Sequence, residues 1–138
     1  MPRNDGMTSE QIFDAHWKNK GKRASVVTFT DTRKLRGAGG TGFANARPSD
    51  RLVTYQGRTF FAEVKSTSEK VSFPYSNIEP MQIGWAKKIV AAGGEYFFFV
   101  HALHTDQWFK VPAQFVLTSD KRSAKFTELS PYIWTPEL

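Results

Sequence analysis

The residues RPSDRLVTYQGRTFFAEVKST, positions 47–67, decide the fold that we expect for this chain. Two runs rich in β-branched and aromatic residues, 52–55 and 59–64, lie on either side of Gln56-Gly57. This pattern is typical of a β-hairpin with a tight turn that contains glycine. The stretch therefore predicts two antiparallel strands joined at Gln56-Gly57.

The register of this hairpin brings three ionisable side chains to one face. With a two-residue loop, Tyr55 pairs with Arg58. Counting back along both strands then places Asp50 opposite Glu63. Opposed residues on one face of an antiparallel ladder have Cβ atoms roughly 4.5–5.5 Å apart. Lys65 follows Glu63 by two residues, so the alternation of a strand keeps its side chain on the same face.

Two facing carboxylates point to a bound cation. Asp50 and Glu63 would repel each other across the ladder, an arrangement that a fold does not adopt for stability. A divalent cation removes this repulsion, and carboxylate oxygens completed by water and phosphate suit Mg²⁺. Such a metal stabilises charge on a phosphoryl group and lowers the pKa of a bound water, while the ammonium of Lys65 can orient the nucleophile. The alternative is that all three are solvated strand charges.

These residues also carry a resemblance to a known class of enzymes. Asp50 and Glu63-Val64-Lys65 resemble the metal-binding core of the PD-(D/E)XK nucleases, with Pro48-Ser49-Asp50 in place of a contiguous proline–aspartate pair. The run GRTFFAEVKSTSEKVSFPYSNIEPMQ, residues 57–82, is similar to the matching run of the RecU family of Holliday-junction resolvases. In that family Ser-Phe-Pro follows the catalytic lysine, and an asparagine and a glutamine come after it. The resemblance covers the chain from about residue 6 to residue 116.

The resemblance implies an α/β fold with a restriction-endonuclease-like core, in which helices flank a mixed β-sheet. It also implies a Mg²⁺-dependent endonuclease, with Mn²⁺ as a substitute metal, that cuts four-way junctions as a homodimer. The catalytic residues that it implies are Glu10, Asp50, Glu63, Lys65 and Gln82. In this scheme Asp50 and Glu63 hold the metal, and Glu10 assists directly or through water. Lys65 positions or activates the attacking water, and Gln82 supports that water or the scissile phosphate.

Glu10 also has a structural interpretation. The capping pattern from Thr8 to Gln11 predicts a helix over residues 9–20, and the helix dipole favours an acid in its first turn. The opening NDGMTSE, residues 4–10, looks like the opening of the RecU-type domain, in which a glutamate on the first helix approaches the metal. The resemblance therefore makes Glu10 a third carboxylate of the site.

Gln82 lies on the apolar face of a second predicted helix, over residues 80–92, which begins at a proline and ends before Gly93-Gly94. A glutamine there either bonds to neighbouring backbone or reaches the metal water or a phosphate. The matching glutamine of the family favours the second interpretation.

The remaining elements complete the sheet. Residues 24–30 predict a strand, and the unbroken apolar run at 95–103 predicts a central strand covered on both faces. Residues 107–111 return as its antiparallel neighbour, and a short helix follows at 112–117. The aromatic tail at 132–134 either packs back on the core or contributes to a subunit interface.

Length and composition predict one soluble domain over residues 1–138. The absence of cysteine fits a reducing compartment. No apolar run approaches about 18 residues, and the N-terminus lacks an apolar signal core. We expect a cytoplasmic protein, in a bacterial host cell if it is phage-encoded, and the small size suggests a phage or compact bacterial version. The histidines lack metal-site spacing and should be structural or exposed: His16, His101 and His104.

The net charge of +6 and pI of about 9.7 favour an anionic partner, with nucleic acid first. The alternative is ordinary charge for solubility. Neither a phosphate-binding loop nor a GxGxxG helix start is present, so no organic cofactor is expected. No helix combines a basic face with a broad apolar face, which disfavours a membrane surface. The residues that we expect to contact the DNA backbone are Arg33, Lys34 and Arg36 of the glycine-rich segment 31–47, together with Arg51, Arg58, Lys87 and Lys88.

Other functions stay open on the residues alone. The glycine-rich segment could be a simple mobile surface loop instead of a DNA contact. A nicking, flap-type or restriction-like nuclease would keep the same site, because the choice of a junction depends on dimer geometry. A catalytically silent DNA-binding module on a nuclease fold is disfavoured, since the set Asp50, Glu63 and Lys65 is complete.

Overall fold

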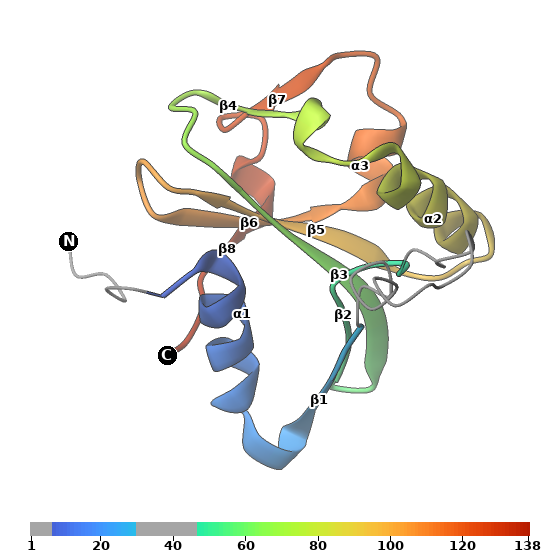
Figure 1. Cartoon of the computed structure of the whole chain (residues 1–138), viewed down its shortest axis with the longest axis vertical. Helices are drawn as coiled ribbons and strands as arrows, with labels where there is room; N and C mark the ends of the chain where they lie inside the picture. The colour runs from blue at the N-terminus through green and yellow to red at the C-terminus, as the bar shows by residue number, and fades with distance from the viewer. Residues whose placement is uncertain (1–6, 30–46) are drawn as a thin grey trace, which may run out of the picture.

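The computed structural model describes residues 7–29 and 47–138, and Figure 1 shows their arrangement. The helices and strands in chain order are α1 (Ser9–Lys18), β1 (Ala24–Thr28), β2 (Arg51–Tyr55), β3 (Arg58–Thr67), β4 (Ser72–Pro74), α2 (Pro80–Ala91), β5 (Tyr96–Ala102), β6 (Gln107–Pro112), α3 (Ala113–Leu117), β7 (Ser123–Lys125) and β8 (Ile133–Trp134). Single 3₁₀ turns are η1 (Gly21–Arg23), η3 (Tyr75–Asn77) and η4 (Ser130–Tyr132). None of the described helices combines the length and hydropathy that a membrane span requires.

The predicted fold class is confirmed. In the described part of the chain, six strands form one mixed sheet in the order β1-β2-β3-β5-β6-β8, and β4 and β7 form a small second sheet. β3 and β5 run parallel, whereas the other neighbours in the large sheet are antiparallel. A parallel pair needs a long crossover, and α2 lies in the connection that supplies it. In Figure 1, α1 lies on one side of the large sheet, and α2 and α3 lie on the other.

Each face of the sheet carries its own hydrophobic core, because β5 is buried on both faces as its apolar run predicts. On one face, Phe13 and Trp17 of α1 pack with Phe99 of β5. On the other face, Ala86 of α2 packs with Phe98 of the same strand. The first of these cores holds α1, and the second holds α2, so both helices are fixed relative to β3.

The predicted hairpin register is confirmed. Tyr55 lies opposite Arg58 in the β2–β3 ladder, as a two-residue loop requires. Both loop residues have positive φ, 53° for Gln56 and 79° for Gly57. Positive φ at both central positions is the geometry of a type I′ turn, which matches the twist of the flanking strands. The chain just before β2 therefore lies beside the middle of β3.

Some element ends differ from the prediction. The second hairpin strand, expected to end at residue 64, continues to Thr67 because the far end of β3 pairs with β5 beyond the reach of β2. The first helix ends at Lys18 instead of residue 20, because Gly21, with φ of 60°, begins a separate 3₁₀ turn. The capping box of Thr8 and Gln11 that we expected is present.

The aromatic tail packs back on the core, the first of the two predicted alternatives. β8 pairs with β6 at the end of the large sheet. The ring of Trp134 lies 4.9 Å from that of Phe99, 5.5 Å from that of Trp108 and 6.0 Å from that of Phe13. In Figure 1 the C-terminal end accordingly returns beside α1. Tail, α1 and sheet thus share one core.

His16 is buried beneath this tail, as the helical stripe predicts. Its Nδ1 accepts a hydrogen bond of 2.8 Å from the backbone N–H of Glu137. Burial lowers the pKa of His16 to about 4, with a smaller contribution from the charge of Lys20 and an opposing one from Glu137. The folded protein therefore holds this ring neutral.

The free energy of unfolding should fall as the pH is lowered from 6.5 towards 4. Within this window the unfolded chain binds a proton on His16 that the folded chain excludes. At about pH 5 the loss from this ring should be about 2 kcal/mol. His16→Gln keeps an acceptor for Glu137 but does not titrate, so this part of the pH dependence should disappear. Urea unfolding of the unmodified protein and of His16→Gln at neutral and mildly acidic pH measures this difference. An equal loss of stability in the two proteins between these pH values would contradict the role given to His16.

Candidate active site

Asp50 and Glu63 are neighbours at the point where the chain enters β2. Both side chains are buried, with each residue 2% exposed. Asp50 Oδ2 accepts a hydrogen bond of 2.8 Å from the Val64 N–H, which holds the carboxylate against β3. The two carboxyl groups are close enough that the negative charge of Asp50 raises the pKa of Glu63. The juxtaposition expected from the hairpin register is therefore present.

Gln82 and Lys65 both approach one oxygen of Glu63. Gln82 Nε2 donates a hydrogen bond of 2.6 Å to Glu63 Oε2, and Lys65 Nζ lies 3.5 Å from the same atom. The other oxygen, Oε1, is buried and has no hydrogen-bond partner among the described residues. A buried carboxylate oxygen without a partner is costly, which makes Oε1 a candidate ligand atom.

The electrostatics of the pair disfavour two negative charges. Burial raises the pKa of Glu63 to about 8, and repulsion from Asp50 adds to the effect while Lys65 and Arg47 oppose it. Burial likewise raises the pKa of Asp50 above its usual range, against the hydrogen bond from Val64. A cation between the two groups would reverse both shifts.

These residues fit a hard divalent cation. Asp50 and Glu63 would supply the protein oxygens, and the unpartnered Oε1 gives a specific atom for coordination. Within residues 7–29 and 47–138, no three Asp, Glu or His side chains lie close enough to form a complete protein cage. Mg²⁺ is usually bound by one or two carboxylates, with water and substrate phosphate completing the shell, and not by a cage made only of protein ligands.

Mg²⁺ binding should release about one proton at neutral pH. Glu63 must lose a proton to bind metal below its pKa of about 8, so the apparent affinity should rise with pH and level off above that value. Isothermal titration calorimetry in two buffers of different ionisation enthalpy measures the released proton. Binding heats that do not depend on the buffer would contradict the assignment of Glu63, and Glu63→Gln should abolish the release together with tight binding.

Glu10 lies at the edge of this site, on the first turn of α1. Its side chain is 54% exposed, and its Oε1 accepts a hydrogen bond of 3.1 Å from Arg51. Its charge contributes to the raised pKa of Asp50. The structure does not gather Glu10 into one ligand set with Asp50 and Glu63. Its assistance to a metal, directly or through water, stays a prediction.

The structure places Arg51 differently from the DNA contact that we expected. Its side chain is 8% exposed and makes two hydrogen bonds of 2.9 Å to the carboxylate of Asp14, in addition to the one to Glu10. Its NH1 also donates to the backbone oxygen of Asp50 at 3.2 Å. Arg51 therefore ties α1 to the chain that carries Asp50, and its guanidinium is not presented to solvent for a phosphate.

Gln82 makes the backbone hydrogen bond of the first interpretation weighed for it, and it also contacts Glu63. Its Oε1 accepts a hydrogen bond of 3.0 Å from the backbone N–H of Glu79, closing the capping box of α2. Its Nε2 is the donor to Glu63. One amide thus links the start of α2 to the carboxylate pair. Its contact with an attacking water or a phosphate stays a prediction.

Sequence reasoning missed two participants, Arg47 and Asp14. Arg47 NH2 lies 3.0 Å from Asp50 Oδ1, and its side chain is 30% exposed, so it bridges the buried site and the surface. Its position three residues before Asp50 was the available signal. Asp14 follows Glu10 by one helical turn on α1, which indicates a shared face but does not identify Arg51 as their common partner.

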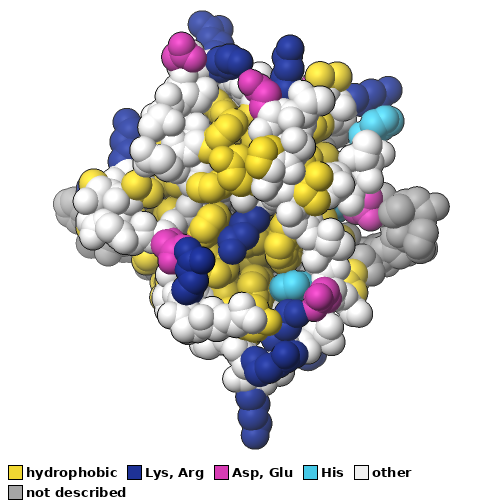
Figure 2. Space-filling view, turned by 180° about the vertical axis from the view of Figure 1, so that it is seen from behind, with side chains coloured by type: hydrophobic (Ala, Val, Ile, Leu, Met, Phe, Trp, Pro, Cys, Tyr) yellow, Lys and Arg dark blue, Asp and Glu magenta, His cyan; other side chains and the backbone are white. Residues whose placement is uncertain are grey.

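The other residues that we expected to contact DNA differ in their exposure and in their pairing. Lys87 and Lys88 are exposed on α2. Arg58 is exposed but ion-paired with Glu95 near the hairpin turn, five residues along β3 from Glu63. Arg33, Lys34 and Arg36 lie outside the described residues. On the face opposite to that of Figure 1, Lys and Arg side chains stand near the top and bottom, and others lie over a central hydrophobic area (Figure 2).

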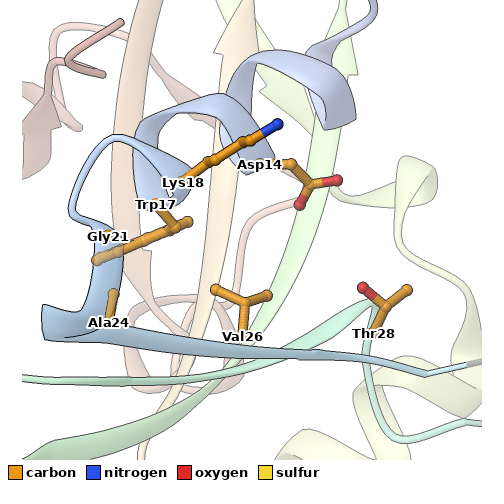
Figure 3. Close-up of a pocket in the computed structure, with 7 residues that line it drawn as sticks. All are labelled: Asp14, Trp17, Lys18, Gly21, Ala24, Val26 and Thr28. Atoms are coloured by element: carbon orange, nitrogen blue, oxygen red, sulfur yellow. The ribbon is translucent and has the colours of Figure 1, made fainter.

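A hollow of about 420 Å³ between α1 and β1 does not belong to the carboxylate pair (Figure 3). Its lining residues are Asp14, Trp17, Lys18, Gly21, Ala24, Val26 and Thr28. Asp14 is the acid in this lining, and both of its oxygens are bonded to Arg51. The hollow therefore offers no free carboxylate for a metal.

The buried His101 is structural, as its sequence context predicts, and His104 is exposed. The Nδ1 of His101 lies 2.8 Å from Ser9 Oγ, and its Nε2 lies 2.6 Å from Asp106 Oδ1. The ring also stacks on Trp108, with ring centroids 4.3 Å apart. This network connects the first residue of α1 with the β5–β6 turn and so holds the helix start that carries Glu10.

Comparison with known proteins gives a family and a fold. A family model described as Recombination protein U matches residues 19–132. Among solved structures, the Holliday junction resolvase Hjc of the archaeal hyperthermophile Archaeoglobus fulgidus is similar, with a TM-score of 0.53 and 14% sequence identity. The alignment covers 87% of this chain and 89% of that one. At 14% identity this similarity shows a shared fold and nothing more. No curated protein matches the chain.

Proposed function

Because the chain belongs to the Recombination protein U family, we propose that it is a Mg²⁺-dependent endonuclease that resolves four-way DNA junctions by hydrolysing phosphodiester bonds. The observation that carries this proposal is the buried pair Asp50 and Glu63, in which one oxygen of Glu63 contacts a lysine and a glutamine and the other has no partner among the described residues. Such a pair has no evident structural use, because its mutual repulsion opposes folding.

Asp50 and Glu63 would hold the metal, for which Mn²⁺ would substitute. Bound Mg²⁺ supplies charge that stabilises the reacting phosphoryl group and makes a water more acidic. Gln82 orients Glu63 through its hydrogen bond, so the carboxylate does not need to reorganise when substrate binds. Lys65, whose side chain is 16% exposed, presents an ammonium at the mouth of the site, where it positions the attacking water and neutralises developing charge.

The charge of the chain supports a nucleic-acid substrate, and the family supports a four-way junction. The chain has a net charge of +6, which favours a phosphate-rich partner. A four-way junction is resolved by symmetric cuts in two strands, so two copies of this site are needed, and a homodimer supplies them. We place the protein in the cytoplasm, as a single nuclease domain acting on cellular or phage DNA.

The experiment compares cleavage of a four-way junction, a flap and a plain duplex of the same sequence, each with Mg²⁺ and with chelator. We expect symmetric cuts in the junction, with Mg²⁺ required. If the flap or the duplex is cut in preference to the junction, the protein is a nuclease with a different substrate and the junction proposal is wrong. Undiminished cutting in chelator would remove the metal mechanism, and tight binding without any cutting would leave a DNA-binding module.

A further inference from the structure

The glycine at position 84 lies in the middle of α2, where glycine destabilises a helix relative to alanine. Apart from its chain neighbours and the nearby backbone of its own helix, a Cβ at Gly84 would meet no described atom within 4 Å. Gly94 differs, because a Cβ there would lie 2.8 Å from the side chain of Ile89. Packing within the described chain therefore explains the glycine at 94 and does not explain the one at 84.

Gly84 is surrounded by an apolar and basic surface, which we call the α2 outer face: Met81, Gly84, Trp85 and Lys88. These residues recur at the spacing of one helix face and line a hollow of about 170 Å³. Met81 is 45% exposed, although methionine is usually buried. Lys88 Nζ lies 5.5 Å from the centre of the Trp85 ring, so the tryptophan and the ammonium form one surface.

This face is suited to an anionic partner. The segment Pro80–Ala91 contains Lys87 and Lys88 and no acidic residue. The start of α2 lies beside the candidate active site, because Gln82, the residue after Met81, donates to Glu63 at 2.6 Å. The outer face of the same helix is therefore within reach of a DNA strand whose phosphate lies at Glu63.

We propose that the α2 outer face binds the DNA strand next to the cut, at the branch point of the junction. The absence of a side chain at Gly84 lets the sugar–phosphate backbone approach the helix. Trp85 stacks on a base exposed at the branch, and Lys88 contacts a phosphate. The face thus contributes to the choice of branched over plain duplex DNA. This inference rests on the proposed function, since it takes DNA as the substrate.

The test measures affinity by fluorescence anisotropy in chelator, so that no strand is cut, for a four-way junction and a plain duplex. Gly84→Ala should raise the melting temperature by roughly 3 °C, because alanine favours the helix. The same change should weaken junction binding by roughly tenfold, because the methyl group holds the strand away. A more stable protein that binds less well is not expected from a purely structural glycine.

Trp85→Ala should weaken junction binding by roughly tenfold and duplex binding much less, because stacking needs an exposed base. Trp85→Phe should restore most of the affinity and serves as the matched control. Unchanged junction affinity in both Gly84→Ala and Trp85→Ala would overturn the proposal. A lower melting temperature for Gly84→Ala would also overturn it, since the glycine would then be needed by the fold.

Two further outcomes separate this inference from the proposed function. If the unmodified protein binds the junction and cuts none of the DNA substrates, the nuclease proposal fails while the α2 outer face is still judged by the affinities. If Gly84→Ala or Trp85→Ala changes the oligomeric state in sedimentation and leaves DNA affinity unchanged, the face is a subunit contact and the inference is wrong.

Discussion

Replacing Lys65 by alanine should reduce the rate of junction cleavage by about 100-fold or more, while junction affinity changes little. The ammonium lies 3.5 Å from Glu63 Oε2, which is buried, so the charge of the lysine acts on the carboxylate with little screening by solvent. Its loss removes a charge that matters most when negative charge develops on the phosphoryl group. Most of the binding energy should persist, since it comes from many phosphate contacts over the whole DNA surface.

Single-turnover cleavage with saturating protein measures the chemical step apart from binding. Asp50→Asn should show at least as large a loss, because it removes a proposed metal ligand and keeps the shape of the side chain. Lys125→Ala is a suitable control, since Lys125 is exposed on β7 of the small second sheet. Wild-type cleavage by Lys65→Ala would exclude the role that we give to this lysine.

Replacing Arg51 by alanine should destabilise the fold by about 3 kcal/mol. The buried guanidinium bonds to Asp14 and Glu10 on α1 and to the backbone of Asp50. Without it the two acids lose their counter-charge, and Asp50 loses a neighbour that lowers its pKa. We therefore expect a melting temperature lower by about 10 °C, together with weaker Mg²⁺ binding because α1 and the site are no longer tied.

Arg58→Ala is the matched control, because Arg58 pairs with Glu95 on an exposed part of the surface. Such pairs contribute little to stability, so its melting temperature should stay near that of the unmodified protein. Calorimetry of both variants at low and high salt distinguishes the buried ion pairs of Arg51 from the exposed, salt-screened pair of Arg58. A stable Arg51→Ala protein with reduced DNA affinity would restore the DNA-contact role that the sequence suggested.

The hairpin and its carboxylate pair could be predicted because the interactions that determine them are local. The turn at Gln56-Gly57 sets the pairing of two adjacent strands, and a period of two then assigns every side chain to a face. Asp50 and Glu63 follow from that count alone. The apolar run of β5 is predictable for a similar reason, since a strand buried on both faces shows no alternation.

Short elements could not be predicted in this way. β4, β7 and β8 span two or three residues each, too few for any period to show. They exist because a partner strand or a core already lies beside them, as β6 does for β8. Their positions are consequences of the assembled fold.

By itself the sequence determined the turn, the register and the three ionisable residues on one face, since each depends on neighbours along the chain. Only the tertiary structure decided that Gln82 reaches Glu63, that Arg51 is buried between two acids, and that Trp134 closes over α1. These contacts join segments that are distant in sequence. They depend on how helices pack against the sheet, and no local pattern encodes the angle and depth of that packing.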